Sequence, residues 1–340
     1  MSRLAVLLAS CALLSASALT AGCATTNQRS EQQALQGRTV VITGASSGFG
    51  RGMAVAFGQR RANVVLAARR TEVLEQVAGE VRSAGGRALV VTTDVGREAD
   101  VQRLAQAAVA EFGRVDVWIN NAGVGALGRF DEVPLADHSR IVDTNLKGVI
   151  YGSHVALHQF RRQGQGTLIN MGSAVSYVPM PYYASYVATK HGVLGLSNAI
   201  NQELRVNGER NIHVVTVMPY AADTPWFDHA ANYTGRSPRQ VLMDPPQKIV
   251  DAVVRAAIHP RREVAVGWKS KAAIAAHRIA PGTTQAVAAG VVHDVQMRDA
   301  AAGPPPHPGA VHQPMATGVG VEGGVRSRMT EEDRRKAAGD

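Results

Sequence analysis

Short apolar runs alternate with longer amphipathic stretches along residues 38–268. The runs are continuously apolar, which predicts strands that are buried on both faces of a sheet covered by helices. Seven strands are expected, at residues 38–44, 63–69, 87–95, 115–121, 166–173, 211–219 and 263–267. The amphipathic stretches predict helices near residues 49–60, 71–84, 97–112, 136–162, 184–207 and 245–258. This alternation predicts an α/β protein whose single main domain is built on a doubly wound, seven-stranded parallel sheet.

The pattern changes after residue 268. Residues 269–299 predict a C-terminal helical extension of two short helices, interrupted at Pro281 and Gly282. Residues 300–340 are rich in proline and glycine and poor in large apolar side chains. Such a segment buries too little surface to offset the entropy lost on ordering, so we expect a disordered tail.

The first 37 residues have a different composition again. Residues 1–23 combine an early arginine, an apolar run and small residues before Cys23, as signal peptides do. The stretch LTAGC resembles the lipobox of bacterial lipoproteins, although Thr20 stands where that group usually has leucine. The resemblance implies a lipid anchor at Cys23 in the bacterial cell envelope, with residues 24–37 as a polar tether. The alternative is a disordered leader on a cytoplasmic protein.

Composition narrows the chemistry. A chain of 340 residues with 45% apolar side chains has room for a sizeable core. The net charge is +9, but the arginine pairs are scattered along the chain, which favours a solvated basic surface over a nucleic-acid site. Both cysteines, Cys11 and Cys23, lie near the N-terminus, so the body of the protein has no thiol for a disulfide, a metal or a nucleophile.

A glycine-rich turn follows the first predicted strand. The sequence TGASSGFG begins at Thr43 and leads into an apolar helix. Its glycines permit a tight turn that brings backbone N–H groups close to an anion at the helix N-terminus. The strand–turn–helix setting favours a phosphate site over an ordinary connection. The residues expected at this site are Gly44, Ser46, Ser47, Gly48, Phe49 and Gly50.

A second motif joins Tyr186 to Lys190. Free tyrosine has a pKa of about 10, and a nearby ammonium lowers this value by stabilising the phenolate. Residues four apart share a helix face, and among the tyrosines of this region only Tyr186 has a lysine at that spacing. The pair is therefore expected to act in acid–base catalysis. The alternative is a packing tyrosine beside a solvated lysine, and the phosphate turn upstream argues against it.

The two motifs together resemble the short-chain dehydrogenase/reductase family, in the branch that carries TGxxxGxG and YxxxK. The resemblance covers about residues 38–268. It implies a Rossmann-type fold and hydride transfer between a nicotinamide dinucleotide and an alcohol, ketone or aldehyde. It also implies that Tyr186 is the general acid/base and that Lys190 hydrogen-bonds the nicotinamide ribose.

The end of the second predicted strand bears on the choice of cofactor. An acidic residue there would accept hydrogen bonds from a free ribose 2′-hydroxyl and repel a 2′-phosphate. This sequence has Ala68 followed by Arg69 and Arg70. We therefore expect NADP(H) to be preferred, with Arg69 as the first candidate contact, while NAD(H) remains the alternative.

Further site residues are expected from the resemblance alone. Asp94 and Val95 match the family's adenine-contacting pair, and the loop at Asn121, Ala122 and Gly123 matches the segment beside the adenine ribose. Without the resemblance, these residues read as a helix cap and a tight loop.

Two polar residues complete the expected catalytic group. Ser173 ends the strand at 166–173, where its hydroxyl would hold the substrate oxygen. Ser176 is the competing candidate. Asn145 matches the family's asparagine that positions a water between the lysine and solvent, and an asparagine inside a helix is otherwise mildly unfavourable.

The sequence departs from the family after the sixth predicted strand. Pro219 and Thr224 match residues that flank the nicotinamide, but Tyr220 replaces the usual glycine and is expected to change the local geometry. The segment at residues 221–235 should form a lid over the substrate. Its aromatic side chains suggest either a hydrophobic substrate, such as a lipid-like one, or ordinary packing.

Several alternatives stay open. A membrane-tethered, non-catalytic dinucleotide-binding protein would keep the phosphate turn, and an epimerase or dehydratase would use bound dinucleotide with a different glycine spacing. His154 and His158 are spaced for a metal, but no carboxylate joins them, so no metal is expected. Homo-oligomers, dimers or tetramers, are expected by resemblance, through the helices at 136–162 and 184–207.

Overall fold

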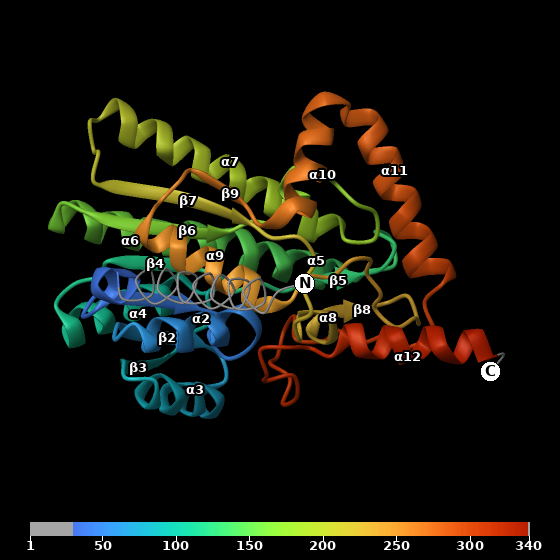
Figure 1. The fold of residues 1–340 in the computed structure, drawn as a ribbon, viewed down its shortest axis with the longest axis horizontal. Coiled ribbons are helices and arrows are strands. Elements are labelled where there is room, and N and C mark those ends of the chain that lie inside the picture. Colours follow the sequence, from blue (N-terminus) through green and yellow to red (C-terminus); the bar gives the residue numbers. More distant parts are fainter. Residues whose placement is uncertain (1–29, 339–340) are drawn as a thin grey trace, which may run out of the picture.

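The computed structural model describes residues 30–338. The predicted signal peptide, Cys23 and residues 24–29 of the predicted tether lie outside the described residues. Residues 30–35 of the predicted tether are helical instead, and Leu35 is buried in the core. The large sheet has seven parallel strands in the order β3-β2-β1-β4-β6-β7-β9 (Figure 1). The strands are β1 (Thr39–Thr43), β2 (Asn63–Ala68), β3 (Arg87–Thr92), β4 (Val117–Asn120), β6 (Gly166–Met171), β7 (Ile212–Met218) and β9 (Glu263–Ala265). This order confirms the predicted doubly wound α/β fold, with its direction of winding reversed between β1 and β4.

Helices cover both faces of this sheet (Figure 1). One face is covered by α2 (Gly48–Gln59), α3 (Thr71–Ser83) and α9 (Pro246–Ile258). The other is covered by α4 (Glu98–Phe112), α6 (Gly148–Gln163) and α7 (Ala184–Val206). The strand side chains are apolar on both faces because both are enclosed.

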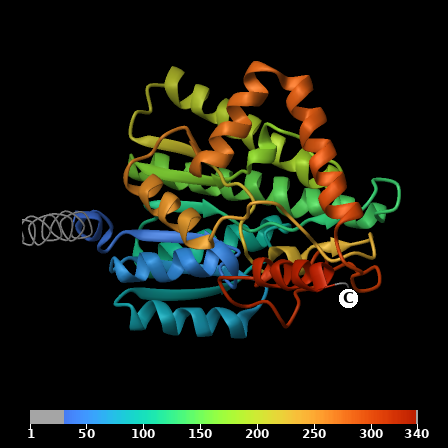
Figure 2. The ribbon, with the colours of Figure 1, turned by 45° about the vertical axis from the view of Figure 1, so that its right-hand side comes forward.

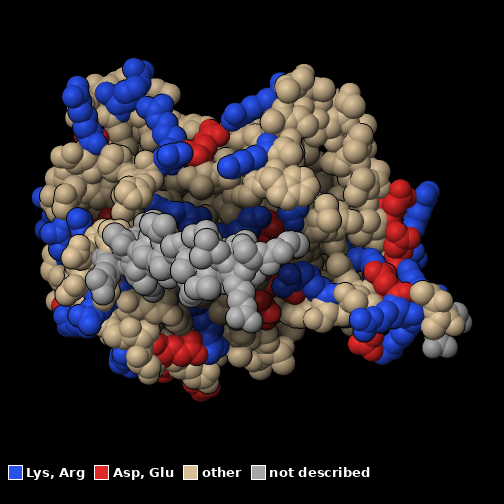
Figure 3. Space-filling model, in the orientation of Figure 1, with Lys and Arg blue, Asp and Glu red and all other residues tan. Residues whose placement is uncertain are grey.

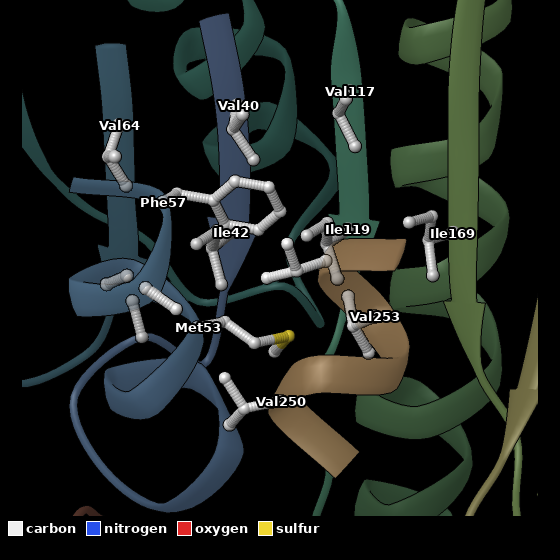
Figure 4. Packing of buried hydrophobic residues seen from close by; sticks show 14 of the residues in the cluster. Val40, Ile42, Met53, Phe57, Val64, Val117, Ile119, Ile169, Val250 and Val253 are labelled. Atoms are coloured by element: carbon white, nitrogen blue, oxygen red, sulfur yellow. The ribbon is translucent and has the colours of Figure 1, made fainter. Parts of the chain in front are cut away.

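The core below β1 shows how the apolar pattern fixes the sheet. Met53 and Phe57 on α2 lie against Ile42, while Val250 and Val253 on α9 fill the space toward β4 and β6 (Figure 4). All five side chains are fully buried. At about 1.5–3 kcal/mol for burying each large apolar side chain, contacts of this kind stabilise the sheet strongly. They hold its carboxyl edge in place.

The helix expected at residues 136–162 has an interruption. It consists of α5 (Leu135–Val142), a π-helical turn η1 (Asp143–Lys147) and α6. Asn145 lies in the π-helical turn. Single π-helical turns inside α-helices often occur at functional sites, because they redirect side chains within a helix.

The segment predicted as a lid has some regular structure. It contains the short helix α8 (Trp226–His229) and the strand β8 (Ala231–Asn232), which pairs in parallel with β5 (Ala126–Leu127). This small second sheet is not predicted by the sequence pattern, because strands of two residues carry no readable periodicity.

The C-terminal extension forms a helical hairpin. Helix α10 (Gly267–Ile279) and helix α11 (Pro281–His293) meet at Ala280, beside the predicted break, and η3 (Asp294–Arg298) follows. The hairpin stands out from the body of the protein (Figure 2). Helix α11 has no buried residue and no charged side chain before its terminal histidine. Its surface is accordingly free of Lys, Arg, Asp and Glu on the face seen in Figure 3.

The path of residues 300–338 differs from the disorder expected from composition. They run across the carboxyl edge of the sheet and end in helix α12 (Val325–Ala338), which lies against the body (Figure 2). Val311 and Val325 are buried. The Asp223 carboxylate accepts hydrogen bonds from the backbone N–H of Val325 and from Arg326. Hydrogen bonds to polar groups of the body thus help to order this segment, whose own few apolar side chains could not do so.

Basic side chains are spread over the visible face among acidic ones and do not form one patch (Figure 3). Within residues 30–338, no helix is long and apolar enough to cross a membrane. The same residues contain no cluster of three or more His, Cys, Asp or Glu side chains arranged to hold a metal ion.

Candidate active site

The segments that the sequence singles out follow the ends of parallel strands. The glycine turn follows β1, Arg69 follows β2, Asn121 follows β4, Ser173 comes after β6 and Pro219 follows β7. Parallel strands end at one edge, where open α/β sheets bind ligands. A cavity of about 860 Å³ lies there. Every predicted site residue lines this cavity except Gly50 and Asn145.

Close backbone contacts explain two glycines of the turn. A Cβ atom on Gly44 would lie 2.8 Å from Cα of Ala122, and one on Gly50 would lie 2.1 Å from the Gly44 carbonyl oxygen. Gly48 has φ of +53° and is the first residue of α2, so its N–H has no partner within the helix. This N–H donates to the carbonyl oxygen of Gly320 at 2.9 Å. The turn therefore presents a hydrogen-bond donor at a helix N-terminus, as a phosphate requires.

Thr43 ties the turn to the loop after β4. Its Oγ1 accepts hydrogen bonds from the N–H groups of Asn121 at 2.9 Å and Ala122 at 3.1 Å. The Asn121 side chain donates to the Thr43 carbonyl at 2.9 Å. Gly123 lines the cavity beside them. The two loops form one rigid cradle, in which Thr43 has a structural part that the sequence argument did not assign.

Arginines gather beside this cradle. Arg70 donates to the hydroxyl oxygens of Ser46 and Ser47, each at 3.0 Å. Arg69 donates to the carbonyl oxygens of Ala310 at 2.6 Å and His312 at 3.0 Å. Burial lowers the pKa of Arg69, and its neighbours Arg140 and Arg70 lower it further while Asp94 opposes them. The region carries concentrated positive charge.

Arg140 was not found by sequence reasoning. It forms an ion pair with Asp94 at 2.5 Å, and both side chains line the cavity. Asp94 also accepts from the N–H of Gly96 at 3.0 Å, so its carboxylate is held in place. Val95 is buried beside it. Arg140 lies on α5 in a stretch without a motif, and only the tertiary structure brings it beside the loop after β3.

Tyr186 and Ser173 are joined by a side-chain hydrogen bond. Burial raises the pKa of Tyr186 to about 12, and the hydrogen bond with Ser173 opposes this rise. The Lys190 Nζ atom lies 5.5 Å from the centre of the Tyr186 ring and donates to the Met171 carbonyl at 2.7 Å. Burial lowers the pKa of Lys190 to about 8. Burial thus raises the pKa of this tyrosine, where the sequence argument expected the ammonium to lower it, because burial disfavours the charged form of both side chains.

Ser176 has a different role from Ser173. Its hydroxyl accepts from the N–H of Ser173 at 3.2 Å, and its residue is buried. Ser173 in turn caps the short 3₁₀ helix η2 (Ala174–Ser176) by accepting from the N–H of Val175. Ser173 is therefore the serine that faces the tyrosine, and Ser176 supports its backbone.

Asn145 is fully buried and bridges two elements of the site. Its Oδ1 accepts from the N–H of Val124 at 2.9 Å, and its Nδ2 donates to the Val124 carbonyl at 2.8 Å. Nδ2 also lies 3.3 Å from the hydroxyl of Thr189, which sits between Tyr186 and Lys190 on α7. The asparagine holds the β4 loop against the helix that carries Tyr186 and Lys190.

The residues after β7 close the cavity. The Pro219 carbonyl accepts from the N–H of Ala174 at 2.8 Å. Thr224 is buried and packs against Gly48. Its Cβ atom lies 3.5 Å from the position that a Cβ atom on Gly48 would occupy. Tyr220, which replaces the family's glycine, lines the cavity with Lys269 lying 5.7 Å from its ring centre.

The predicted lid contributes aromatic side chains to the cavity. Trp226 lies 5.0 Å, between ring centres, from Tyr186 and 5.2 Å from Phe227. Tyr233 does not line the cavity and donates instead to Asp137 at 2.5 Å. The opposite wall comes from the α10–α11 hairpin, a contribution that no sequence motif indicates. Its lining side chains include Ala276, Ile279, Thr283, Val287 and Val291.

Comparison with known proteins agrees with this geometry. Residues 38–233 match the family model described as short chain dehydrogenase. An uncharacterized oxidoreductase of Bacillus subtilis, YxnA, is 35% identical over 241 residues, which span 70% of this chain and 67% of that protein. The 3beta-hydroxysteroid dehydrogenase 1 of Eggerthella lenta is 37% identical over 193 residues, which span 56% of this chain and 73% of that protein.

Solved structures of this fold carry nicotinamide dinucleotides. A short chain dehydrogenase/reductase from Burkholderia phymatum in complex with NAD has a TM-score of 0.66 and 25% identity, covering 74% of this chain and 96% of that one. An alcohol dehydrogenase from Thermococcus sibiricus complexed with 5-hydroxy-NADP has a TM-score of 0.58 and 27% identity, covering 67% of this chain and 94% of that one. This chain belongs to the short-chain dehydrogenase/reductase family and is an oxidoreductase with a nicotinamide dinucleotide site.

Proposed function

We propose that this protein interconverts an apolar alcohol and its ketone or aldehyde with NADP(H), with Tyr186 as the general acid/base. The observation that supports the proposal is the meeting of Tyr186, Ser173 and Lys190 in the cavity that the glycine turn also lines. A bound nicotinamide dinucleotide would donate or accept the hydride. The backbone around Gly48 and the loop at Asn121 would hold it, since both line the same cavity.

Proton transfer is assigned to the Tyr186 hydroxyl. Its raised pKa, about 12, keeps it protonated at neutral pH, as an acid for carbonyl reduction must be. During reduction the carbonyl carbon gains the hydride, while the Tyr186 O–H bond breaks and its proton moves to the substrate oxygen. Oxidation reverses both transfers. Ser173 stabilises the developing oxyanion by donating to the same oxygen.

Lys190 supports the phenolate that remains after proton transfer. Its pKa of about 8 leaves it mostly protonated at neutral pH, close enough to the tyrosine ring to stabilise negative charge. Asn145 contributes by positioning, because its buried side chain donates a hydrogen bond to Thr189, which precedes Lys190 on α7.

NADP(H) is favoured over NAD(H) by the charge at the end of β2. Among residues 30–338, neither Arg69 nor Arg70 has a carboxylate partner within ion-pair distance. Arg69 instead donates to neutral backbone carbonyls. A 2′-phosphate would supply the missing negative charge through charge-assisted hydrogen bonds, which are stronger than bonds to a carbonyl.

An apolar substrate is favoured by the walls of the cavity beyond Tyr186. Trp226 and Phe227 form one wall, and Ile279, Val287 and Val291 of the hairpin form the other. A wall of this kind binds a hydrocarbon skeleton and leaves the reacting oxygen to the polar groups. The similarity to a 3beta-hydroxysteroid dehydrogenase supports a bulky secondary alcohol as the first compound to test.

The test is a screen of hydroxysteroids, long-chain ketones and small aldehydes with NADPH and NADP, on the wild type and on Tyr186→Phe. The variant should lose turnover by about 10²–10⁴-fold or more, because it has no proton to transfer, while its affinity for NADPH changes little. Tyr182→Phe is the matched control, since the Tyr182 hydroxyl contacts His293 instead of Ser173. Turnover by Tyr186→Phe at the wild-type rate would disprove the mechanism. Tight NADPH binding without turnover of any compound would favour the non-catalytic alternative.

Assembly and location are separate proposals. A homo-oligomer through the surfaces of α6 and α7 is expected, and its test is the mass of the protein in solution by light scattering. A lipid anchor at Cys23 is expected from the lipobox-like segment, and mass analysis of the mature N-terminus from membrane and soluble fractions would decide it. An unprocessed N-terminus in the soluble fraction would favour a cytoplasmic enzyme.

A further inference from the structure

The groove around the glycine turn is lined on its outer side by the chain's own C-terminal region. Residues 310–320, named here the covering segment, run along it in extended and turn conformations without regular structure. Ala310, Pro314 and Met315 of this segment line the cavity itself. The segment thus lies at the end of the cavity that Arg69 and Asp94 also form.

The covering segment contacts the groove through its carbonyl oxygens. Arg69 donates to Ala310 and His312, and Arg70 donates to Met315 at 3.0 Å and Thr317 at 3.2 Å. Arg51 donates to the Val319 carbonyl at 2.8 Å. Arg140 donates to the Val311 carbonyl at 3.4 Å, so four arginines bind a row of backbone carbonyls.

The last of these contacts lies at the glycine turn. The Gly48 N–H, which begins α2, donates to the Gly320 carbonyl at 2.9 Å. A backbone N–H carries one proton and is directed along one line, so a phosphate oxygen at this position would replace the carbonyl. The covering segment and a dinucleotide phosphate need the same donor.

Charge favours the phosphate at these positions. Carbonyl oxygens are neutral, and the ion pairs of the described residues leave Arg69 and Arg70 without a carboxylate. Burial lowers the pKa of both arginines, and the Asp94 carboxylate offsets this only in part at Arg69. A phosphorylated ligand would neutralise this cluster, whereas the carbonyls only satisfy its hydrogen bonds.

We propose that the covering segment occupies the phosphate-binding groove in the cofactor-free protein and that NADP(H) displaces it on binding. The inference rests on the proposed function, since it needs a dinucleotide in this groove. The segment acts as a tethered competitor, which lowers the apparent affinity by the fraction of molecules in which it is docked.

The segment is attached at both of its ends. On one side the Ala310 N–H donates to the His229 carbonyl at 2.7 Å. On the other, Gly323 donates to the Asp223 carbonyl at 3.2 Å and α12 follows. Displacement requires the loop between these attachments to leave the groove and to give up the contacts of His312 with Asp137 at 2.8 Å and of the Thr317 carbonyl with His229 at 3.0 Å. The segment stays at high local concentration when the dinucleotide dissociates.

The direct test is amide hydrogen exchange on the full chain, with and without saturating NADPH, following fragments that cover residues 309–324. Faster exchange in these fragments with NADPH is expected, together with slower exchange at residues 44–50. Unchanged or slower exchange in the covering segment would overturn the proposal. Nucleotide binding is followed in the same samples by NADPH fluorescence, so absence of binding, which sinks the proposed function as well, is distinguished from binding without displacement.

Glycine variants in the full chain supply an independent test. Gly309 has φ of +51°, and a Cβ there would lie 2.3 Å from the His229 carbonyl oxygen. Gly318 has φ of +67°, and a Cβ there would lie 2.4 Å from Nε2 of His229. Gly309→Val and Gly318→Val should therefore undock the segment without changing any residue of the groove.

The expected result is a Kd for NADPH about tenfold lower in both glycine variants, the change that removing a segment docked in about nine-tenths of molecules produces. Ala316→Val is the matched control, because Ala316 is exposed and should leave the Kd unchanged. A Kd equal to or higher than the wild-type value, in variants whose hydrogen exchange shows the segment released, would overturn the proposal.

Discussion

The region of β1, β2 and α2 and the region after residue 266 are held in place by different forces. In the first, Val40, Ile42, Leu66 and Phe57 are all fully buried, and apolar contact orders the chain. In the second, α11 has no buried residue, and the covering segment beyond the buried Val311 is held mainly by hydrogen bonds from arginines. Both regions line the same cavity.

This difference suggests that one part of the site is rigid and that the other part can move. Buried apolar side chains are close-packed, so the glycine turn that rests on them keeps its shape whether or not a ligand is present. Hydrogen bonds to carbonyls at the surface exchange readily for bonds to water or to an anion. Segments with few buried apolar contacts are the ones that open first. The four predictions below test this contrast.

The largest effect is expected in the apolar region, from Gly50→Ala. The new methyl would lie 2.1 Å from the Gly44 carbonyl oxygen, so the turn must move, and we expect the free energy of unfolding to fall by about 3 kcal/mol or more. Gly79→Ala is the control, because that glycine lies within α3 with no atom within 4 Å of a Cβ. The free energy of unfolding of this control should rise by up to about 1 kcal/mol, because alanine has a higher helix propensity than glycine. Equal urea midpoints for the two variants would show that the turn is not rigid.

Arg69→Ala links the two regions and should have the next largest effect. Losing a charged donor costs about 1.5–3 kcal/mol, so the ratio of Kd for NADP(H) to Kd for NAD(H) should rise about 10–100-fold. The ratio is the decisive quantity, because release of the covering segment affects both nucleotides alike. Arg87→Ala, on an exposed side chain, is the control. An unchanged ratio would remove Arg69 from the 2′-phosphate site.

Lys190→Met tests the effect of burying a lysine charge in the wall of the cavity. The folded-state pKa of Lys190 is about 8, against 10.5 for free lysine, so between these values the unfolded state binds more protons and wild-type stability rises with pH. From pH 8 to pH 10, the free energy of unfolding of the wild type should rise by about 2 kcal/mol relative to that of Lys190→Met. Above pH 10 the raised pKa of Tyr186 acts in the opposite direction, because the unfolded tyrosine loses its proton first. Parallel stability curves in urea at pH 8, 9 and 10 would contradict burial of the lysine.

Asp223→Asn should give the smallest effect and confine it to the C-terminal region. The Asp223 carboxylate accepts from the N–H of Val325 at 2.8 Å and from Arg326 Nε at 3.2 Å. Its neutral replacement should cost about 1 kcal/mol of local stability, seen as faster hydrogen exchange in α12 with no change in β1. Glu322→Gln removes a nearby exposed charge and is the control. Faster exchange spreading into the sheet would mean that the two regions open together.

The sequence indicated the sheet well because its strands are apolar on both faces and its helices are amphipathic. That pattern reflects burial, and burial is what forms the sheet. It indicated the small sheet of β5 and β8 poorly, since two-residue strands have no period. It also missed the π-helical turn at Asn145, whose hydrogen bonds to Val124 come from a loop 21 residues away.

Composition was a weak guide to residues 300–338. Low apolar content indicates that a segment cannot order itself, but it does not say whether another part of the chain offers donors. Arg69, Arg70 and Arg51 offer them here, and Asp223 accepts from the start of α12. A tail of this kind takes its order from its partners, which lie about 100 to 270 residues away in the chain.

The local sequence therefore determined the strands, the glycine turn and the four-residue spacing of Tyr186 and Lys190, because each of these depends on residues close together in the chain. Only the tertiary structure decided that Ser173 and not Ser176 meets Tyr186, that burial raises the pKa of the tyrosine, and that Arg140 pairs with Asp94. It alone placed α11 and the covering segment against the cavity. These are contacts between residues distant in sequence, and their energies depend on which groups lose water together, a quantity that no local pattern records.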